Sequence, residues 1–195
     1  MVSNNPLAST VLGTVLAQVF GTLSLVLPII LLTKASGSSL NALFLNKQRS
    51  WVWLLVSIIG FLVFFLLAAF GLSKAFFPNN GVTFSRFLAL TPALLVLVLC
   101  NGLREELWFR GLFLKKYGRF LLPFSSNLLA AIIFTSFHVQ VQYSRSLPIF
   151  LAVALIQGLI LGYLMQKSES LLAPAIFHAG IDIPIYLVYL SYVSR

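Results

Sequence analysis

The chain has 195 residues, of which 59% are hydrophobic and 9% are charged. Soluble domains carry about 25% charged residues, so the composition excludes an ordinary soluble protein and predicts an integral, multi-pass protein of the cell membrane. The net charge is +9, but most basic residues lie in short gaps between apolar runs and form no patch interleaved with aromatic residues. This placement indicates anchoring at the lipid bilayer and excludes a nucleic-acid partner.

The apolar runs predict an all-α fold, a polytopic transmembrane helix bundle of about six spans. A helix needs about 20 apolar residues to cross the bilayer, and the alternating segments of a β-barrel are absent from the sequence. In chain order, the predicted spans cover residues 9–33, 51–72, 87–114, 126–141, 147–165 and 171–193. No basic residue precedes the first run, so we interpret it as a retained helix rather than a secretory signal.

The basic residues in the gaps predict the orientation of the bundle. Alternate gaps lie on the same side of the membrane, and the side with more Lys and Arg faces the cytoplasm. One side holds Lys34, Lys47, Arg49, Lys115, Lys116, Arg119 and Lys167, and the other holds Lys74, Arg86, Arg145 and Arg195. Seven basic residues against four predict that both termini lie outside the cytoplasm.

The third span contains the stretch "NGLREELWFRG", residues 101–111. Two of the four acidic residues, Glu105 and Glu106, are adjacent here and point about 100° apart on a helix. Glu106 and Arg110 are four residues apart, which predicts an ion pair on one face. Glu105 is then the carboxylate outside that pair and a candidate general base. The alternative interpretation is that this cluster caps the helix at the headgroup layer.

The fourth and fifth spans each carry one further signal. "FTSFHVQ" places His138 in the fourth span. Such a histidine can also be a hydrogen-bonded residue that packs two helices together. "GLILG", residues 158–162, is a GxxxG pattern in the fifth span. It allows a close approach of another helix, either inside this bundle or in a dimer.

The sixth span contains "FHAGID", with His178 and Asp182 one turn apart on the same helical face. Ionisable residues inside a membrane span are costly unless they are paired or face water, so each is a functional candidate. Glu105, His138, His178 and Asp182 together form a set that could activate a water molecule or bind a metal ion.

Three motifs carry a resemblance to a known family. "EELWFR" fits E-E-x-x-x-R, "FTSFH" fits F-x-x-x-H, and "HAGID" fits H-x-x-x-[N/D]. In this order on successive helices, they resemble the signature of the CAAX prenyl protease type 2 and bacteriocin-processing (CPBP, or abortive-infection) intramembrane proteases. The resemblance covers about residues 90–195. It therefore divides the chain into N-terminal transmembrane helices, residues 1–86, and a CPBP-like protease core, residues 87–195.

The resemblance implies an endopeptidase that hydrolyses a peptide bond near the membrane-proximal end of a peptide or protein. Glu105 and His138 would position and deprotonate a water molecule. His178, helped by residue 182, would stabilise the tetrahedral oxyanion. That position is often Asn in the prenyl proteases, and an ionised Asp182 cannot donate the hydrogen bond that an Asn can.

The second glutamate and the arginine of the first motif have a supporting role in the same family. Glu106 and Arg110 would hold the geometry of the site. A zinc-dependent and a metal-free mechanism both remain open, because the candidate ligands come from three helices and lack the local H-E-x-x-H of helical zinc sites. We predict no other cofactor.

Other functions fit the sequence less well. A serine mechanism lacks a G-x-S-x-G motif, and Ser136 points to a different helical face from His138. A proton-coupled transporter could also use intramembrane Glu, His and Asp, but the sequence has no inverted repeat. A non-catalytic membrane scaffold or immunity protein of the same family is the alternative to the enzyme.

Overall fold

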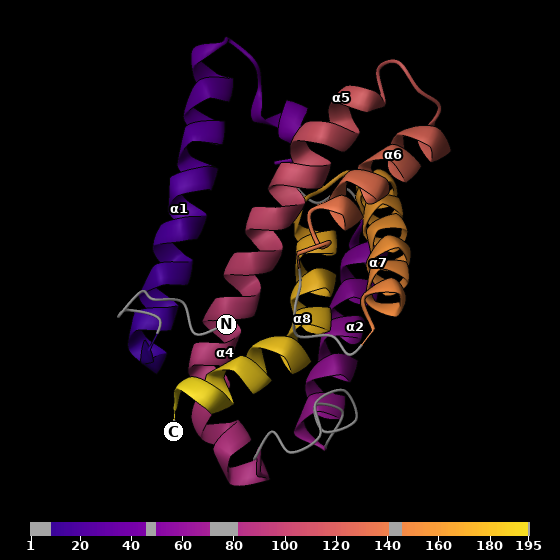
Figure 1. The fold of residues 1–195 in the computed structure, drawn as a ribbon. Helices are drawn as coiled ribbons and strands as arrows, with labels where there is room; N and C mark the ends of the chain where they lie inside the picture. The colour runs from indigo at the N-terminus through magenta and orange to yellow at the C-terminus, as the bar shows by residue number, and fades with distance from the viewer. Residues whose placement is uncertain (1–8, 46–49, 71–81, 141–145, 195) are drawn as a thin grey trace. The chain divides into compact units, whose positions relative to one another are not determined.

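The structure is a computed structural model that describes residues 9–45, 50–70, 82–140 and 146–194. In these residues all regular secondary structure is helical (Figure 1), which confirms the predicted all-α fold. The chain divides into two compact units. Unit 1 consists of Met1–Ile29, Val56–Arg104 and Ala175–Arg195, and unit 2 consists of Ile30–Leu55 and Glu105–Pro174.

Among the residues that the structure describes, five helical stretches are long and apolar enough to cross a membrane. The third is continuous over 34 residues, because α4 runs on through η3 into α5. The spans are α1 (Val11–Ala35), α2 (Trp51–Ala69), α4 (Phe84–Glu106) with η3 (Leu107–Leu114) and α5 (Lys115–Tyr117), α7 (Leu147–Ser168), and α8 (Leu172–Val193). The protein is therefore a multi-pass membrane protein.

The fourth predicted span is shorter than the sequence suggested. It forms α6, Pro123–Ser136, with 14 residues, or about 21 Å at 1.5 Å per residue, against a hydrocarbon core of about 30 Å. Pro123 begins the helix, where its missing N–H is not needed. The chain turns after Ser136, and the N–H of His138 bonds to Thr135 three residues back. Residue 141, the last residue of the predicted span, lies outside the described residues.

The core of unit 1 joins α4 to α8. Leu94 and Leu97 of α4 pack in one apolar cluster with Ile183 and Leu187 of α8, and all four side chains are fully buried. Phe87 at the start of α4 adds an aromatic contact to Phe65 of α2, with ring centroids 5.1 Å apart. This packing holds two helices that each carry polar residues of the sequence motifs.

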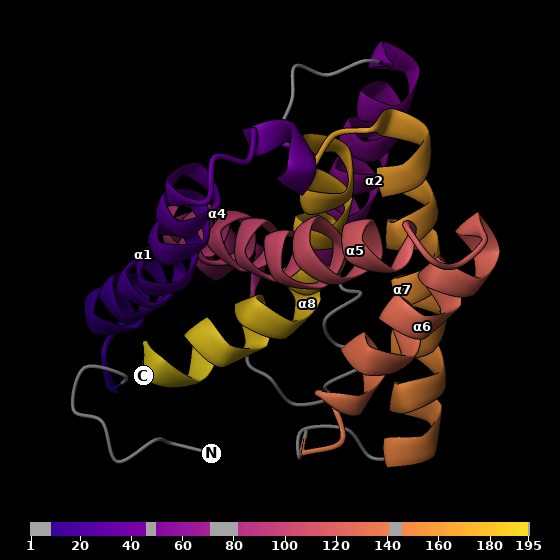
Figure 2. The same ribbon diagram turned by 90° about the horizontal axis from the view of Figure 1, so that it is seen from above.

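In unit 2, α6 and α7 lie side by side in both views (Figures 1 and 2). A Cβ atom on Gly158 would lie 2.9 Å from the Cβ atom of Ala131 in α6, and one on Gly162 would overlap the side chain of Asn127. Asn127 donates a hydrogen bond to the carbonyl of Leu159 at 2.9 Å. The GxxxG pattern therefore packs within this protein's own bundle, which confirms the first of its two interpretations.

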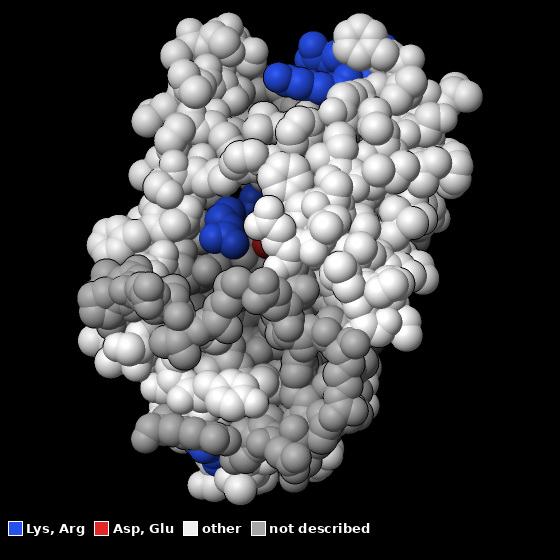
Figure 3. Space-filling view, in the orientation of Figure 1, with Lys and Arg blue, Asp and Glu red and all other residues white. Residues whose placement is uncertain are grey.

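The outer surface of the helices is apolar. Large hydrophobic side chains are exposed along α1, α2 and α7, and a soluble protein rarely leaves such an extended apolar surface open to water. Figure 3 shows few charges on the visible face: one group of Lys and Arg side chains lies at the end where α5 lies, and smaller ones lie at mid-face and at the opposite end. Contact with lipid accounts for the apolar surface and for the basic residues at the ends, because basic residues are favoured at the headgroup layer.

Candidate active site

The E-E-x-x-x-R motif lies where α4 changes its helical geometry. From Leu107 to Leu114 the chain forms a π-helix, and the N–H of Lys115 bonds to the carbonyl of Arg110, five residues earlier. Short π-helical segments are rare and are found often at functional sites. The wider turn begins directly after Glu106, so it changes the direction in which the following residues project.

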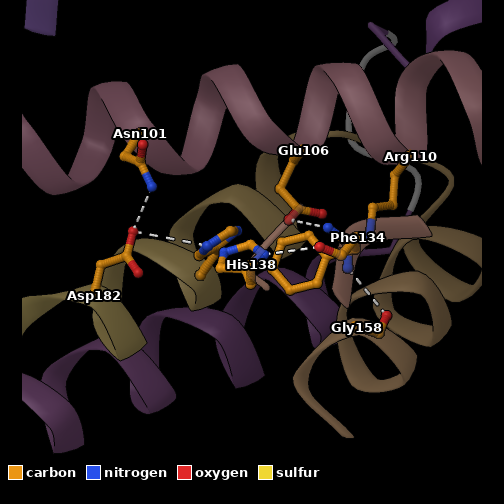
Figure 4. Close-up of polar contacts among 8 residues, drawn as sticks. Asn101, Glu106, Arg110, Phe134, His138, Gly158 and Asp182 are labelled. Carbon is orange, nitrogen blue, oxygen red and sulfur yellow. Dashed lines mark hydrogen bonds and ion pairs between the residues drawn. The ribbon is translucent and has the colours of Figure 1, made fainter. Parts of the chain in front are cut away.

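Glu106 and Arg110 form the ion pair that their spacing predicts. Arg110 Nη1 donates to Glu106 Oε1 at 2.7 Å, and both side chains are fully buried. The same guanidinium donates through Nη2 to the carbonyl of Gly158 in α7 at 3.1 Å (Figure 4). A buried charge is stable only with a partner of opposite charge and with further hydrogen bonds. The pair therefore ties η3 to α7 inside unit 2.

Phe134 connects this ion pair to His138. The Cζ atom of Arg110 lies 4.6 Å from the centroid of the Phe134 ring, within the range of a cation–π contact. The same ring lies 4.4 Å from the imidazole of His138. Phe134 thus packs against both residues, which explains an aromatic residue at the first position of the F-x-x-x-H motif.

The backbone of Phe134 determines the protonation of His138. The Nδ1 atom of His138 lies 2.8 Å from the Phe134 carbonyl oxygen. A carbonyl only accepts hydrogen bonds, so Nδ1 carries the proton and Nε2 keeps its lone pair in the neutral ring. The sequence predicted His138 inside a helical span, but it lies in the turn after α6. That turn leaves the ring half-buried instead of enclosed.

In unit 1, His178 and Asp182 face each other on α8 as predicted. His178 Nε2 lies 3.7 Å from Asp182 Oδ2, and both residues are buried. This separation is too long for a hydrogen bond, so the interaction is electrostatic. It favours a proton on Nε2, the ring nitrogen that faces the carboxylate.

Asp182 has a second partner that the sequence analysis missed. Asn101 of α4 donates through Nδ2 to Asp182 Oδ2 at 2.8 Å (Figure 4). The approach of α4 to α8 depends on Gly102, where a Cβ atom would lie 2.5 Å from the carbonyl oxygen of Ala175. A buried amide in an apolar span is the signal that could have identified Asn101, since polar groups there need a partner.

The six predicted residues therefore occupy two groups, one in each unit. Unit 2 contains Glu105, Glu106, Arg110 and His138, and unit 1 contains His178 and Asp182. Glu105 is half-buried and directly precedes Glu106 at the end of α4. Each group places ionisable side chains inside or beside a membrane span. A charge there is costly unless it is paired or faces water, so both groups are functional candidates.

A metal ion in this site would need several His, Cys, Asp or Glu side chains close together. Among residues 9–45, 50–70, 82–140 and 146–194, no three His, Cys, Asp or Glu side chains lie close enough together to hold an ion. Structural and catalytic zinc sites need three or four such ligands. The described side chains thus do not make up such a set of zinc ligands.

The fold and these two groups define a class: a polytopic helical membrane protein with paired ionisable residues in its spans. The family described as type II CAAX prenyl endopeptidase Rce1-like matches residues 87–184, half of the chain, and the chain belongs to this family. The match includes every residue from Glu105 to Asp182 and confirms the resemblance carried by the three motifs. Comparison with curated proteins and with solved structures finds no match.

Proposed function

We propose that this protein is an intramembrane endopeptidase that cleaves a peptide bond near the membrane-proximal end of a protein or peptide. The observation that carries the proposal is the family match, which spans both groups of buried ionisable residues. Membership of an endopeptidase family implies a protein substrate, and the five candidate spans imply that the substrate is met at the bilayer.

The first step is the activation of water by Glu105 and His138. Water attacks the carbonyl carbon of the scissile bond while the carboxylate of Glu105 takes one of its protons. His138 supports this role because its Nδ1 proton is bound to the Phe134 carbonyl. Its Nε2 lone pair is then available to accept a hydrogen bond from the same water and to orient it.

The second step is stabilisation of the tetrahedral intermediate. His178 would donate a hydrogen bond to the oxyanion that forms on the carbonyl oxygen. Asp182 supports this role by its contact with the imidazole, which fixes the orientation of the ring. When the C–N bond breaks, the proton taken by Glu105 passes to the leaving nitrogen, so a free amine and a carboxylate are produced.

Glu106 and Arg110 hold the backbone of this site in place. Their buried ion pair and the bond to the Gly158 carbonyl hold the start of η3 against α7. This anchoring restricts the backbone of the adjacent Glu105. A general base must be held within hydrogen-bond reach of the proton that it removes.

The test is cleavage of a peptide library, with prenylated and unmodified members, by the purified full-length protein in lipid nanodiscs. We expect cleavage by the wild type and none by Glu105→Ala. Glu169→Ala is the matched control, because Glu169 is an exposed carboxylate at the end of α7. Absence of cleavage by a folded wild type, or equal cleavage by Glu105→Ala, would favour the non-catalytic scaffold.

The same assay tests the role of metal. We expect a chelator to leave wild-type cleavage largely intact, because the proposed steps use Glu105, His138 and His178 with water. Zinc in equimolar amount in the purified protein, with activity lost on chelation and restored by zinc, would replace this mechanism with a metal-dependent one.

A further inference from the structure

Asn101 is a buried amide with partners on both of its polar atoms. The residue is 5% exposed, and its Nδ2 donates to Asp182 Oδ2 at 2.8 Å. Its Oδ1 accepts hydrogen bonds from Arg104 Nη2 at 2.6 Å and from Gln18 Nε2 at 3.4 Å. An amide buried without partners costs free energy, so these three contacts hold Asn101 in one orientation.

The direction of these hydrogen bonds follows from the chemistry of arginine. A guanidinium only donates, so the atom of Asn101 that faces Arg104 must be the oxygen. The NH2 group then faces Asp182, and Oδ2 of Asp182 must accept its hydrogen. That oxygen is also the atom that faces His178 Nε2. Asn101 thus determines which atom of Asp182 faces the histidine.

Helix α1 contributes to this arrangement although it lies outside the residues that match the family. Thr14, Gln18 and Thr22 are four residues apart and form a polar stripe along one face of an apolar helix. Thr22 Oγ1 donates to the carbonyl of Cys100 at 3.3 Å. Gly21, on the same face, lies against the Arg104 guanidinium, where a Cβ atom would be 3.7 Å from Nη1, an ordinary contact distance.

We propose that Asn101 is a positioning residue of the endopeptidase site, and that Gln18 of α1 and Arg104 hold it so that Asp182 faces His178. The effect on catalysis rests on the proposed function, whereas the effect on His178 does not. Asn101 does not contact the reacting atoms in this proposal. It acts through Asp182 on the orientation and protonation of the imidazole.

Nitrogen NMR of the histidine rings in the full-length protein tests the arrangement without any substrate. The chain has two histidines, so His138 is a reference in the same sample. We expect the neutral rings to carry the proton on Nε2 in His178 and on Nδ1 in His138. Asn101→Leu should produce a mixture of both forms in His178 and leave His138 unchanged.

Gln18→Leu is the milder variant for the case in which Asn101→Leu does not fold. It should shift the His178 signals in the same direction by a smaller amount. The matched control is Ser24→Ala, because Ser24 is an exposed polar residue of the same helix that donates to the carbonyl of Gly21. His178 signals that stay as in the wild type in both Asn101→Leu and Gln18→Leu would overturn the proposal.

The effect of Asn101 on catalysis is tested by placing a carboxylate at position 101. Asn101→Asp places a carboxylate against Asp182 and should lower kcat by about 10–100-fold, the usual cost of losing an orienting partner. KM should change little, because the residue does not touch the substrate. Adding Asp182→Asn should not restore kcat, because the amide that then donates to the carboxylate at position 101 presents its NH2 group, and not an oxygen, to His178 Nε2.

The two kinds of measurement separate the possible failures. A double variant that regains the wild-type kcat would overturn the positioning role. If no variant and no wild-type protein cleaves peptides while the His178 signals respond as expected, the proposed function fails and the arrangement around Asp182 stands.

Discussion

The contacts of Phe134 show how one residue can serve two motifs. Its ring packs against Arg110 of the first motif and against His138 of the second, while its carbonyl accepts the Nδ1 proton of that histidine. The sequence pattern identifies the aromatic residue and the histidine by their spacing. It does not reveal the arginine, because the cation–π contact joins two separate helices.

Arg110 is expected to contribute to stability as well as to activity. Arg110→Ala would leave Glu106 as a buried carboxylate without its ion-pair partner, which costs about 3–5 kcal/mol. We expect a clearly lower melting temperature in detergent together with loss of cleavage. Arg119→Ala is the control, because Arg119 is exposed and a surface change costs less than about 0.5 kcal/mol. An unchanged melting temperature of Arg110→Ala would show that the residue contacts the substrate instead.

A substitution at position 182 tests whether His178 needs a charged partner or only a hydrogen-bonding one. Asp182→Asn keeps the shape of the side chain, and its amide oxygen can still accept the hydrogen bond from Asn101. We therefore expect this variant to retain most of the cleavage activity.

By contrast, Glu105→Gln and His138→Ala remove the proposed base and its partner. We expect rates at least about 10²-fold lower for them, the usual contribution of general-base catalysis. The measurement is the cleavage rate of one peptide at a single pH. A loss in Asp182→Asn as large as in Glu105→Gln would mean that the carboxylate charge is required, as it is beside many metal-bound histidines.

At the scale of elements, the contact between α6 and α7 supports one half of the site. Gly158 serves this contact twice, since its missing side chain lets α6 approach and its carbonyl accepts a hydrogen bond from Arg110. The short length of α6 has a consequence for the same region. The chain turns directly after Ser136, and that turn carries His138.

A larger residue at position 162 is expected to separate these two helices. The new methyl group of Gly162→Ala would overlap Asn127, whose amide would have to give up its bond to the Leu159 carbonyl. Overpacking of this kind costs about 1–3 kcal/mol, so the melting temperature should fall. Ala152→Leu adds apolar atoms to the exposed face of the same helix and should leave melting unchanged. Equal melting of Gly162→Ala and the wild type would contradict the observed packing.

At the scale of the whole molecule, the orientation in the membrane stays a prediction. Lys115, Lys116 and Arg119 follow the first motif closely, and basic residues favour the cytoplasmic side. A cysteine introduced at the exposed Gly118, with Cys100→Ala to remove the native thiol, should react with an impermeant thiol reagent only from the cytoplasmic side. Labelling only from the outer side would reverse the orientation and place the Glu pair near the opposite surface.

The sequence by itself determined the membrane class, the helical fold, the ion pair of Glu106 with Arg110, and the facing of His178 and Asp182. Each of these depends on the length of an apolar run or on residues one helical turn apart, and both are local properties of the chain. The family follows in the same way, because its three motifs are short and ordered.

The tertiary structure alone decided which other residues join these pairs. Gln18 is 83 positions before Asn101, Asn101 is 81 before Asp182, and Arg110 is 48 before Gly158. No local period relates such residues, and their contacts form only where packing brings two helices together. The tertiary structure also decided where α6 ends. The apolar run predicts a span through residue 141, whereas the backbone turns after Ser136, before His138.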